Sequence, residues 1–471
     1  MIKILIEKEL REIIISTKFA ITFGVCAVLI LLAFISGASS YKTSRVQHEA
    51  ALAENLRQME GITSWQSVRG YRIFLPPQPL ASLVTGVSND IGRSVEMSGR
   101  SGLSAQNSRF NDEPVYAVFR FLDLDFIFQI VLSLFAILFA YNAINGEKEQ
   151  GTLRLSFVNA LPRSHYIIGK VVGSFIAIGI PVLIPILLGC LLLPLLGVSL
   201  TGDEWLRLFL IITAGLLYFG AFLMLSIFVS ALTSRSSSSF LILLVLWIFF
   251  VLIIPRSSIL LAGRAVEVPS VDDISSRKAR LSRQLFSEDA EAMSNFKPGK
   301  GGKMEKILED FQKMMKENAE KRERKMRELN GKLQEERMNR LAHQERVATS
   351  FARISPTSSF SLAAINLAGT STELKQHFLE EATAYQKSYV NFVQEKTGMN
   401  LSGGIIISIK STDSEEEEKP IDIHELPQFR YSGLPLDRII RNAILDLGVL
   451  GFFNVLFFAG AFVAFQRYDL R

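Results

Sequence analysis

The charged residues with the most distinctive spacing lie in INGEKEQGTLRLSFVNALPRSHYIIGK, residues 144–170. Glu147 and Glu149 stand two positions apart, and Gly151 and Thr152 follow directly. The chemistry open to such a group is either catalysis within the chain or recognition of a partner. The rest of the sequence decides between these two.

Signatures of catalysis are missing from the sequence. There is no His-Glu-x-x-His pair for a metalloprotease and no Gly-x-Ser-x-Gly elbow. A P-loop needs Gly-x-x-x-x-Gly-Lys-Ser/Thr, and its nearest imitation, KPGKGGK at 297–303, is followed by methionine. The histidines are scattered, with no ligand-like pair: His48, His165, His343, His377 and His424. We therefore expect no catalytic residue, metal or cofactor in this chain, and an intramembrane enzyme finds no support.

The elements that must position the charged stretch are apolar. Of the 471 residues, 49% are hydrophobic and 21% are charged, and the mean hydropathy is +0.27. Crossing the roughly 30 Å of membrane hydrocarbon takes about 20 apolar residues in a helix. The sequence thus predicts an all-α polytopic membrane protein, in which the fifth apolar run is short and ends at Pro255. The six predicted transmembrane helices are 18–37, 126–143, 167–193, 206–231, 239–258 and 442–465.

The cysteines and the first apolar run agree with this class. Cys26 and Cys190 both lie inside predicted transmembrane helices, which favours apolar packing over a disulfide or a metal site. Seventeen residues of mixed charge precede the first run, which is typical of an uncleaved anchor and not of a signal peptide.

Lysine and arginine mark one side of the predicted bundle. Basic residues gather in the N-terminal 18 residues, in the 144–166 hairpin, at Arg235 and after the last apolar run, whereas the loop 197–204 has none. Short basic loops stay in the cytoplasm. Both termini are therefore expected there, including an amphipathic helix over 1–17 and a tail over 466–471, in the plasma (inner) membrane of a prokaryote.

Two long segments, 38–125 and 259–441, then fall outside the cytoplasm and are expected to build one large, mainly helical domain. Charged helical patterns cover 304–348, with a break expected at LNGK, and 372–399, whereas STDSEEEEKP at 411–420 is expected to be a loop. Alternating signs on the first of these helices indicate a solvated face and not a nucleic-acid surface.

The hairpin itself predicts a short helix after Gly151. Thr152 is placed to cap it, apolar residues follow, Pro162 ends it and Ser164 is placed to cap the next transmembrane helix. Such a helix serves either as a plain interfacial anchor or as a rigid peg gripped by a cytoplasmic partner.

The hairpin closely resembles the coupling-helix segment of ABC exporter permeases of the type-2 class, also called type V exporters. Members carry Glu-x-x-x-Gly-Thr-Leu between transmembrane helices two and three, then a Pro-Arg-Ser-like turn and a Gly-Lys. The resemblance also covers the six crossings and the amphipathic N-terminal helix. PPQPLASLVTG (76–86) and ISPTSSFSLAAINLAGTS (354–371) are weaker matches, to the subset with large extracytoplasmic loops. The matching positions are Glu147, Gly151, Thr152, Leu153, Pro162, Arg163, Ser164, Gly169 and Lys170.

The resemblance implies partners that this chain lacks. Separate cytoplasmic ABC ATPase subunits would bind ATP and Mg²⁺ and dock on the hairpin, and a second permease, identical or related, would complete the complex. The residues expected to couple to the ATPase are Glu147, Glu149, Gly151, Thr152, Leu153, Arg154, Pro162 and Arg163.

Other residues are weaker candidates. Ile6, Leu10, Ile13 and Ile14 form the apolar stripe of the N-terminal helix, and its charged residues, Glu9 included, are expected mainly on the other faces. That helix either lies on the membrane or forms part of the ATPase dock. Candidates for a pathway or gating role are Asp123, Asp125, Pro181 and Pro185.

Two functions remain open. The leading hypothesis is a permease subunit that moves an unidentified substrate across the membrane with a partner's ATP hydrolysis. The alternative is a mechanotransmitter or scaffold, in which hydrolysis inside moves the outer domain to regulate an extracytoplasmic protein partner without transport.

Overall fold

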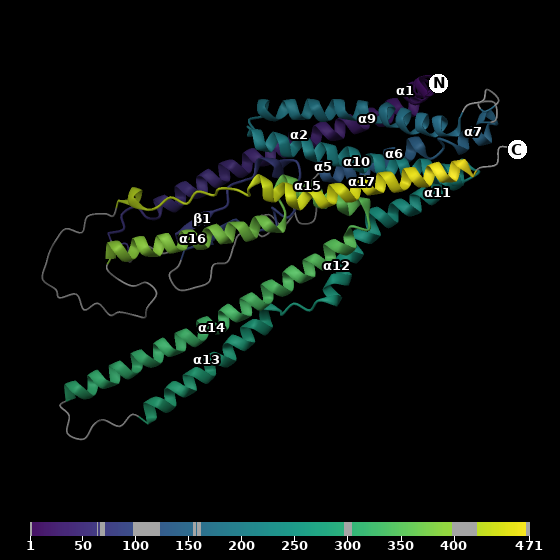
Figure 1. Ribbon diagram of the computed structural model, residues 1–471. Coiled ribbons are helices and arrows are strands. Elements are labelled where there is room, and N and C mark those ends of the chain that lie inside the picture. Colours follow the sequence, from purple (N-terminus) through teal and green to yellow (C-terminus); the bar gives the residue numbers. More distant parts are fainter. Residues whose placement is uncertain are drawn as a thin grey trace. The chain divides into compact units, whose positions relative to one another are not determined.

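The computed structural model describes residues 2–63, 65, 71–97, 123–153, 157, 162–295, 304–397 and 422–467. The expected all-α polytopic membrane fold is confirmed: most of these residues are helical, and the strands among them are short (Figure 1). Within these described residues, six helices are long and apolar enough to cross a membrane, namely Thr17–Arg57, Leu124–Glu149, Arg163–Leu195, Gly202–Leu232, Ser236–Ala265 and Leu436–Gln466.

The described residues fall into two compact units. Unit 1 takes in those of 1–256, 352–389 and 420–471, and unit 2 those of 257–351 and 390–419. This differs from the expectation of one domain built from both long loops. The described part of the first loop, and residues 352–389 of the second, pack with the membrane helices in unit 1.

The chain opens with the amphipathic helix α1 (Ile2–Ile14) and the first transmembrane helix α2 (Thr17–Arg57). Ser16 caps α2, its hydroxyl accepting the Phe19 N–H at 3.1 Å. The helix runs 20 residues beyond the expected end at 37, because no helix breaker separates the apolar run from the helical TSRVQHEAALAENLRQME that follows.

A small structured region follows α2 in unit 1. Strands β1 (Arg72–Phe74) and β2 (Ser94–Glu96) pair antiparallel with Ile73 opposite Val95, and the 3₁₀ turn η2 (Pro79–Ser82) lies between them. Tyr71 stacks on Tyr389 with ring centroids 5.7 Å apart, which joins this region to the first part of α16 (Thr372–Thr397).

The second transmembrane helix contains a π-helical turn. It consists of α5 (Leu124–Phe126), the π turn η3 (Ile127–Leu132) and α6 (Ser133–Ala140), and α7 (Asn145–Glu149) continues it after a turn. A π turn misaligns one backbone carbonyl. The Gln129 carbonyl accepts hydrogen bonds from the hydroxyls of Ser133 at 2.5 Å and Tyr218 at 3.0 Å.

The centre of unit 1 is α10 (Gly202–Leu232), which packs against α6, α9 (Arg163–Leu195), α15 (Pro356–Ala368) and α17 (Leu436–Gln466). Tyr218 of α10 stacks on Phe360 of α15, with centroids 5.1 Å apart. The loop before α17 contains the 3₁₀ turn η5 (Ile423–Glu425). The side chain of Asp446 in α17 is fully buried, and its carboxylate pairs with the Arg353 guanidinium at 2.6 Å.

The fifth transmembrane helix continues through Pro255 and beyond its expected end at 258. α11 (Ser236–Trp247), the π turn η4 (Ile248–Ile253) and α12 (Ile254–Ala265) form one uninterrupted helix. Proline has no N–H to donate, so a carbonyl one turn earlier loses its partner. The Ser355 hydroxyl donates to the Phe250 carbonyl at 2.6 Å, which satisfies such a group and lets the helix continue.

The main part of unit 2 is a long helical hairpin made by α13 (Val271–Ser294) and α14 (Met304–Ala352), and the last residue of α14 is assigned to unit 1. The expected break at LNGK does not occur, because a single glycine costs only about 1 kcal/mol in a helix and α14 passes through Gly331. Its arms are antiparallel: Lys325 pairs with Glu288 at 3.1 Å, and Gln344 reaches the Val266 carbonyl. The expected loop 411–420 lies outside the described residues.

Candidate functional site

The hairpin that begins at α7 is fixed to the end of α10 and its following loop. The Ser230 hydroxyl of α10 accepts the Ile144 and Asn145 N–H groups at 3.0 and 3.2 Å. The Lys148 ammonium donates to the carbonyls of Ala231 at 2.7 Å and Thr233 at 3.2 Å. A cation at the carbonyl end of a helix also complements the helix dipole. These contacts hold α7 against the α10–α11 turn.

Glu149 lies on the exposed side of the same turn. Its carboxylate accepts the backbone N–H of Ser236 at 2.9 Å and the hydroxyl of Ser236 at 2.7 Å. Ser236 is the first residue of α11, so Glu149 supplies the acceptor that an N-terminal turn lacks. Together with Lys148, this carboxylate ties the hairpin to both helices of the α10–α11 pair.

Glu147 points the other way, into a buried polar cluster. Its side chain is 9% exposed and accepts three hydrogen bonds, from Lys8 at 2.7 Å, Lys170 at 3.0 Å and Tyr166 at 2.7 Å. Lys8 belongs to α1, whereas Tyr166 and Lys170 belong to α9. A single carboxylate therefore connects three segments that are far apart in the sequence.

Lys170 completes the cluster by pairing with a second carboxylate. Its ammonium lies 2.5 Å from Glu9 of α1, and both side chains are almost fully buried. The pKa of Glu9 lies above its ordinary value, because burial disfavours the charged form and the ammonium of Lys170 only partly offsets this. The expectation that Glu9 faces away from the buried stripe is wrong.

Two glycines bring α1 close enough for these contacts. A Cβ on Gly169 would lie 2.8 Å from Cβ of Leu5, and one on Gly173 would lie 2.8 Å from Cβ of Glu9. Any side chain at either position would push α1 away from α9. The Gly-Lys pair of the sequence motif thus has two parts to play: the glycine admits α1, and the lysine binds it.

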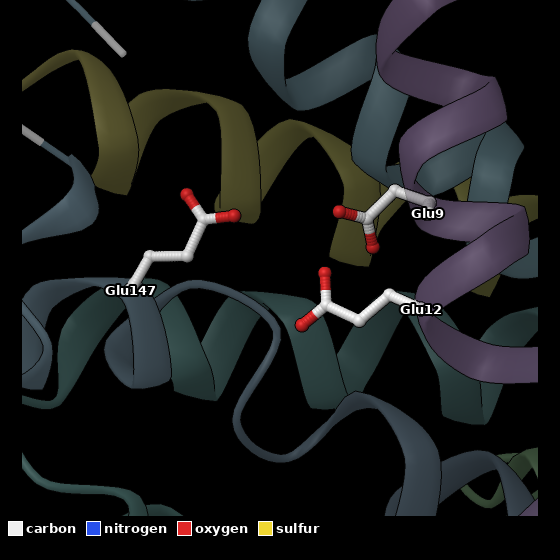
Figure 2. Close-up of side chains that lie close together, drawn as sticks. All are labelled: Glu9, Glu12 and Glu147. Atoms are coloured by element: carbon white, nitrogen blue, oxygen red, sulfur yellow. The ribbon is translucent and has the colours of Figure 1, made fainter. Parts of the chain in front are cut away.

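Figure 2 shows Glu9 and Glu12 projecting from α1 toward Glu147 of α7. Their carboxylate oxygens lie within 4.8 Å of one another, a separation that would also suit a metal ion. However, the Lys170 ammonium already binds Glu9 and Glu147, and Lys8 binds Glu147 a second time. The positive charge beside Glu9 and Glu147 is therefore provided by the protein's own lysines.

The segment after α7 turns sharply at Gly151, whose φ of +74° is in the left-handed region. A Cβ there would touch nothing within 4 Å, so the glycine is needed for the backbone angle alone. Thr152 donates to the Glu147 carbonyl at 3.4 Å, and Leu153 is buried. Arg154, and the helix expected over 152–161 except for positions 152, 153 and 157, lie outside the described residues.

The far end of the hairpin is held by α9 and α17. Pro162 takes the N-cap position of α9. The expected cap, Ser164, is two residues later and lies inside the helix. Arg163 donates to the Gln466 carbonyl near the end of α17 at 2.5 Å. Phe157 contacts Tyr166 with ring centroids 5.5 Å apart. The hairpin is thus anchored where it starts and where it ends.

The four pathway candidates lie away from this cluster. Asp123 caps α5, its two oxygens accepting the N–H groups of Phe126 at 2.9 Å and Thr85 at 3.2 Å. Asp125 accepts a hydrogen bond from the Ser361 hydroxyl at 3.2 Å. α9 runs without interruption through Pro181 and Pro185, of which the second is buried. These positions do not join the hairpin site.

Sequence reasoning missed the buried pairing around Glu147, namely that Lys170 binds both Glu147 and Glu9. A signal for each was present. Glu9 lies three positions after Ile6 and four before Ile13, which puts it on their side of the helix. Lys170 is a lone charge at the start of a membrane-length apolar run, where an ionisable residue usually has a partner.

Comparison with known protein families agrees with this architecture. Residues 3–470 match the family model described as ABC-2 family transporter protein, which is nearly the whole chain. No curated protein matches the sequence.

Proposed function

This chain belongs to the ABC-2 transporter family, and we propose that it is the permease subunit of an exporter whose ATP is hydrolysed by separate ABC ATPase subunits. Membership makes it a multi-pass membrane permease. The substrate, the direction of movement and the docking of the ATPase on residues 144–166 are the proposed part, and a second permease, identical or related, would complete the complex.

The observation that carries the proposal is the buried cluster around Glu147. A partner that moves the hairpin must also move α1 and α9, because the buried Glu147 binds the half-exposed Lys8 of α1 at 2.7 Å and the buried Lys170 of α9 at 3.0 Å. Separating buried, hydrogen-bonded charges leaves each without a partner, at a cost of about 3–5 kcal/mol. Displacement of the hairpin is thus passed to a transmembrane helix and not absorbed locally.

The same geometry divides the coupling residues into two groups. Glu147 and Glu149 bind neighbouring parts of the chain, so we assign them to holding the hairpin in place. Contact with the ATPase is assigned to the segment from Gly151 to Arg163, which leaves α7 through a left-handed turn. The ATP and Mg²⁺ would be bound by the partner.

We place this end of the bundle in the cytoplasm of a prokaryotic cell, at the plasma membrane. The basic residues of α1, the hairpin and the end of α17 support this orientation, since short basic loops stay inside. The structure supports it too: α1, α7 and the last turn of α17 lie at the same end of unit 1 (Figure 1). The apolar exterior of the bundle would contact lipid.

The test uses the complex of the full-length chain with its ATPase. Glu147→Gln is expected to lower the ATPase activity that depends on the permease, whereas Glu7→Gln serves as the matched control. Glu7 lies on the same helix as Lys8 and Glu9, but its side chain is 57% exposed and its ion pair is with Arg11 of the same helix. Equal activity of the two variants would contradict the proposed coupling.

A second pair of variants tests the left-handed turn. Gly151→Ala strains the backbone by about 1–2 kcal/mol, and is expected to weaken docking of the ATPase in a pull-down. Gly61→Ala imposes the same kind of strain at φ +81°, with open space around the new Cβ, far along the chain from the hairpin. Loss of docking in both variants would indicate general destabilisation instead.

Unit 2 favours one further candidate function, that of a mechanotransmitter. α14 has 49 residues, hence a length of about 74 Å at 1.5 Å per residue, and it pairs with α13. Such an arm suits binding to an extracytoplasmic protein partner. Deletion of 275–350 discriminates between the two functions. Transport that is retained after the deletion supports the permease. If the full-length protein transports nothing and the deletion abolishes regulation of the partner, the mechanotransmitter is supported.

A further inference from the structure

A polar cavity lies beside α2, just where the apolar run of that helix ends. Its volume is about 60 Å³. A water-sized group needs roughly 10–15 Å³ by the same measure, so the cavity holds roughly four to six such groups. The polar residues that line it are Ser36, Ser40, Tyr41, Ser44, Gln78, Ser82, Thr85, Ser88, Asn89, Arg93 and Asp123.

The walls of the cavity are built by close backbone packing. A Cβ on Gly37 of α2 would lie 2.0 Å from the Ser82 carbonyl oxygen, so the turn η2 rests directly on the helix only because a glycine is there. On the other side of that turn, the Thr370 hydroxyl donates to the Val84 carbonyl at 3.1 Å, and the Val87 N–H donates to the Thr370 carbonyl at 3.0 Å.

These contacts join the two segments, 76–86 and 354–371, that stood out in the sequence without a role in ATPase coupling. Gly86 is also required where they meet, because its φ is +51° and a Cβ would lie 2.5 Å from the Thr370 hydroxyl. Segment 76–86, which lines the cavity, is thus held in place by its contacts with segment 354–371, and a fixed wall is what a binding site needs.

The lining supplies hydrogen-bond donors that suit a ligand with negative charge. Ser36, Ser40 and Ser44 follow one another at four-residue spacing on α2, so their hydroxyls form a row on one face of the helix. Arg93 is the basic residue among the described lining residues. The acidic one, Asp123, already accepts backbone N–H groups on both oxygens. Hydroxyl donors around a guanidinium are the usual surroundings of a bound phosphate.

The position on α2 indicates where that phosphate comes from. Exposed apolar residues form a stripe along α2 below the cavity, at Ile21, Val25, Val28, Leu32 and Ile35. Ser36 lies one turn beyond Leu32, at the end of this stripe. In a membrane, the end of an apolar helical stripe lies at the level of the lipid head groups. The stripe therefore offers a surface for an acyl chain, and the cavity at its end offers a surface for a phosphate.

We propose that this cavity is a phosphate-binding site, with the phosphate of a phospholipid as its ligand and the stripe of α2 as the surface for an acyl chain. The Arg93 guanidinium and the serine hydroxyls of α2 donate to the phosphate oxygens. The site is separate from the hairpin, and its occupancy does not depend on which ATPase the permease uses.

The test measures binding to the full-length protein in detergent, by native mass spectrometry with added phosphatidylglycerol and by calorimetry with inorganic phosphate. Arg93→Gln is expected to weaken binding about tenfold, the usual effect of losing one charge-assisted hydrogen bond. Arg72→Gln is the matched control, since Arg72 lies in the same small sheet region but does not line the cavity.

The two probes separate the sources of the phosphate. Phosphatidylglycerol binding that is sensitive to Arg93, without measurable binding of inorganic phosphate, supports the lipid. If inorganic phosphate binding is sensitive to Arg93 and phosphatidylglycerol does not bind, the phosphate site is supported, but its ligand is a soluble phosphorylated molecule. If Arg93→Gln does not fold, the Ser40→Ala, Ser44→Ala double variant decides by the same measurements. Binding of both probes that is unchanged by these variants, or reduced equally by Arg72→Gln, overturns the proposal.

Discussion

Replacing Lys170 by methionine is the sharpest perturbation of the buried cluster. Methionine nearly matches the side chain in length but removes the charge that lies 2.5 Å from Glu9 and 3.0 Å from Glu147. The two carboxylates are then buried close together, and only Glu147 keeps another cation, Lys8. Removing one partner from a buried ion pair destabilises a protein by about 3–5 kcal/mol. We expect Lys170→Met to lower the free energy of unfolding by that amount.

A second substitution separates the electrostatic cost of Lys170→Met from any loss of packing. Adding Glu9→Gln to Lys170→Met removes the carboxylate that was left without a cation, and is expected to restore about 1–3 kcal/mol. Unfolding is followed by denaturant titration in detergent, with tryptophan fluorescence as the signal. The reasoning fails if the double variant is no more stable than Lys170→Met alone, because the loss would then not be electrostatic.

The pH dependence of the same variant follows from Glu9. Its pKa in the folded protein is raised by burial above the ordinary 4.5, and losing the Lys170 ammonium raises it further. A carboxyl with a raised folded pKa binds its proton more tightly in the folded state, so stability falls as pH rises through the window above 4.5. The stability gap between Lys170→Met and the unaltered protein should therefore narrow on acidification toward that value. A gap that widens would refute the assignment to Glu9.

Two further predictions concern packing in unit 1. Gly37→Ala should displace η2 from α2 and raise protease sensitivity there, because the new Cβ would lie 2.0 Å from the Ser82 carbonyl oxygen; Gly24→Ala, on the same helix with open space around it, should not. Ser355→Ala should lower the free energy of unfolding by about 1–3 kcal/mol by leaving a carbonyl of η4 without a donor. Ser350→Ala, at an exposed position, is the control and should change stability by less than about 0.5 kcal/mol.

Hydropathy was enough to predict the six transmembrane helices, because each must present a long apolar run to the membrane. It was not enough to predict where they end. α2 continues as a polar helix beyond its apolar run, and α12 continues through Pro255 because Ser355 supplies a donor from another part of the chain. Helix ends that depend on distant partners carry no local signal.

The candidate site shows the same division. The spacing of Glu147, Gly151 and the Pro-Arg turn identified the hairpin, because a left-handed turn and a helix start each need particular residue types. The position of α15 against α10 and α17 had no such signal. The residues of its first turn are small and polar, with Thr357 and Ser359 buried, and only tertiary packing decides that they lie inside.

The π turn η4 also has a consequence for how the chain is made. The Phe250 carbonyl receives its hydrogen bond from a residue 105 positions later. At a synthesis rate of about 5–20 residues per second, the ribosome adds Ser355 roughly 5–20 s after Phe250. During that interval the fifth transmembrane helix holds an unsatisfied carbonyl, which is costly in hydrocarbon. Insertion of this helix is therefore complete only when α15 has arrived, so a nascent chain truncated before residue 355 should be an early substrate for membrane quality control.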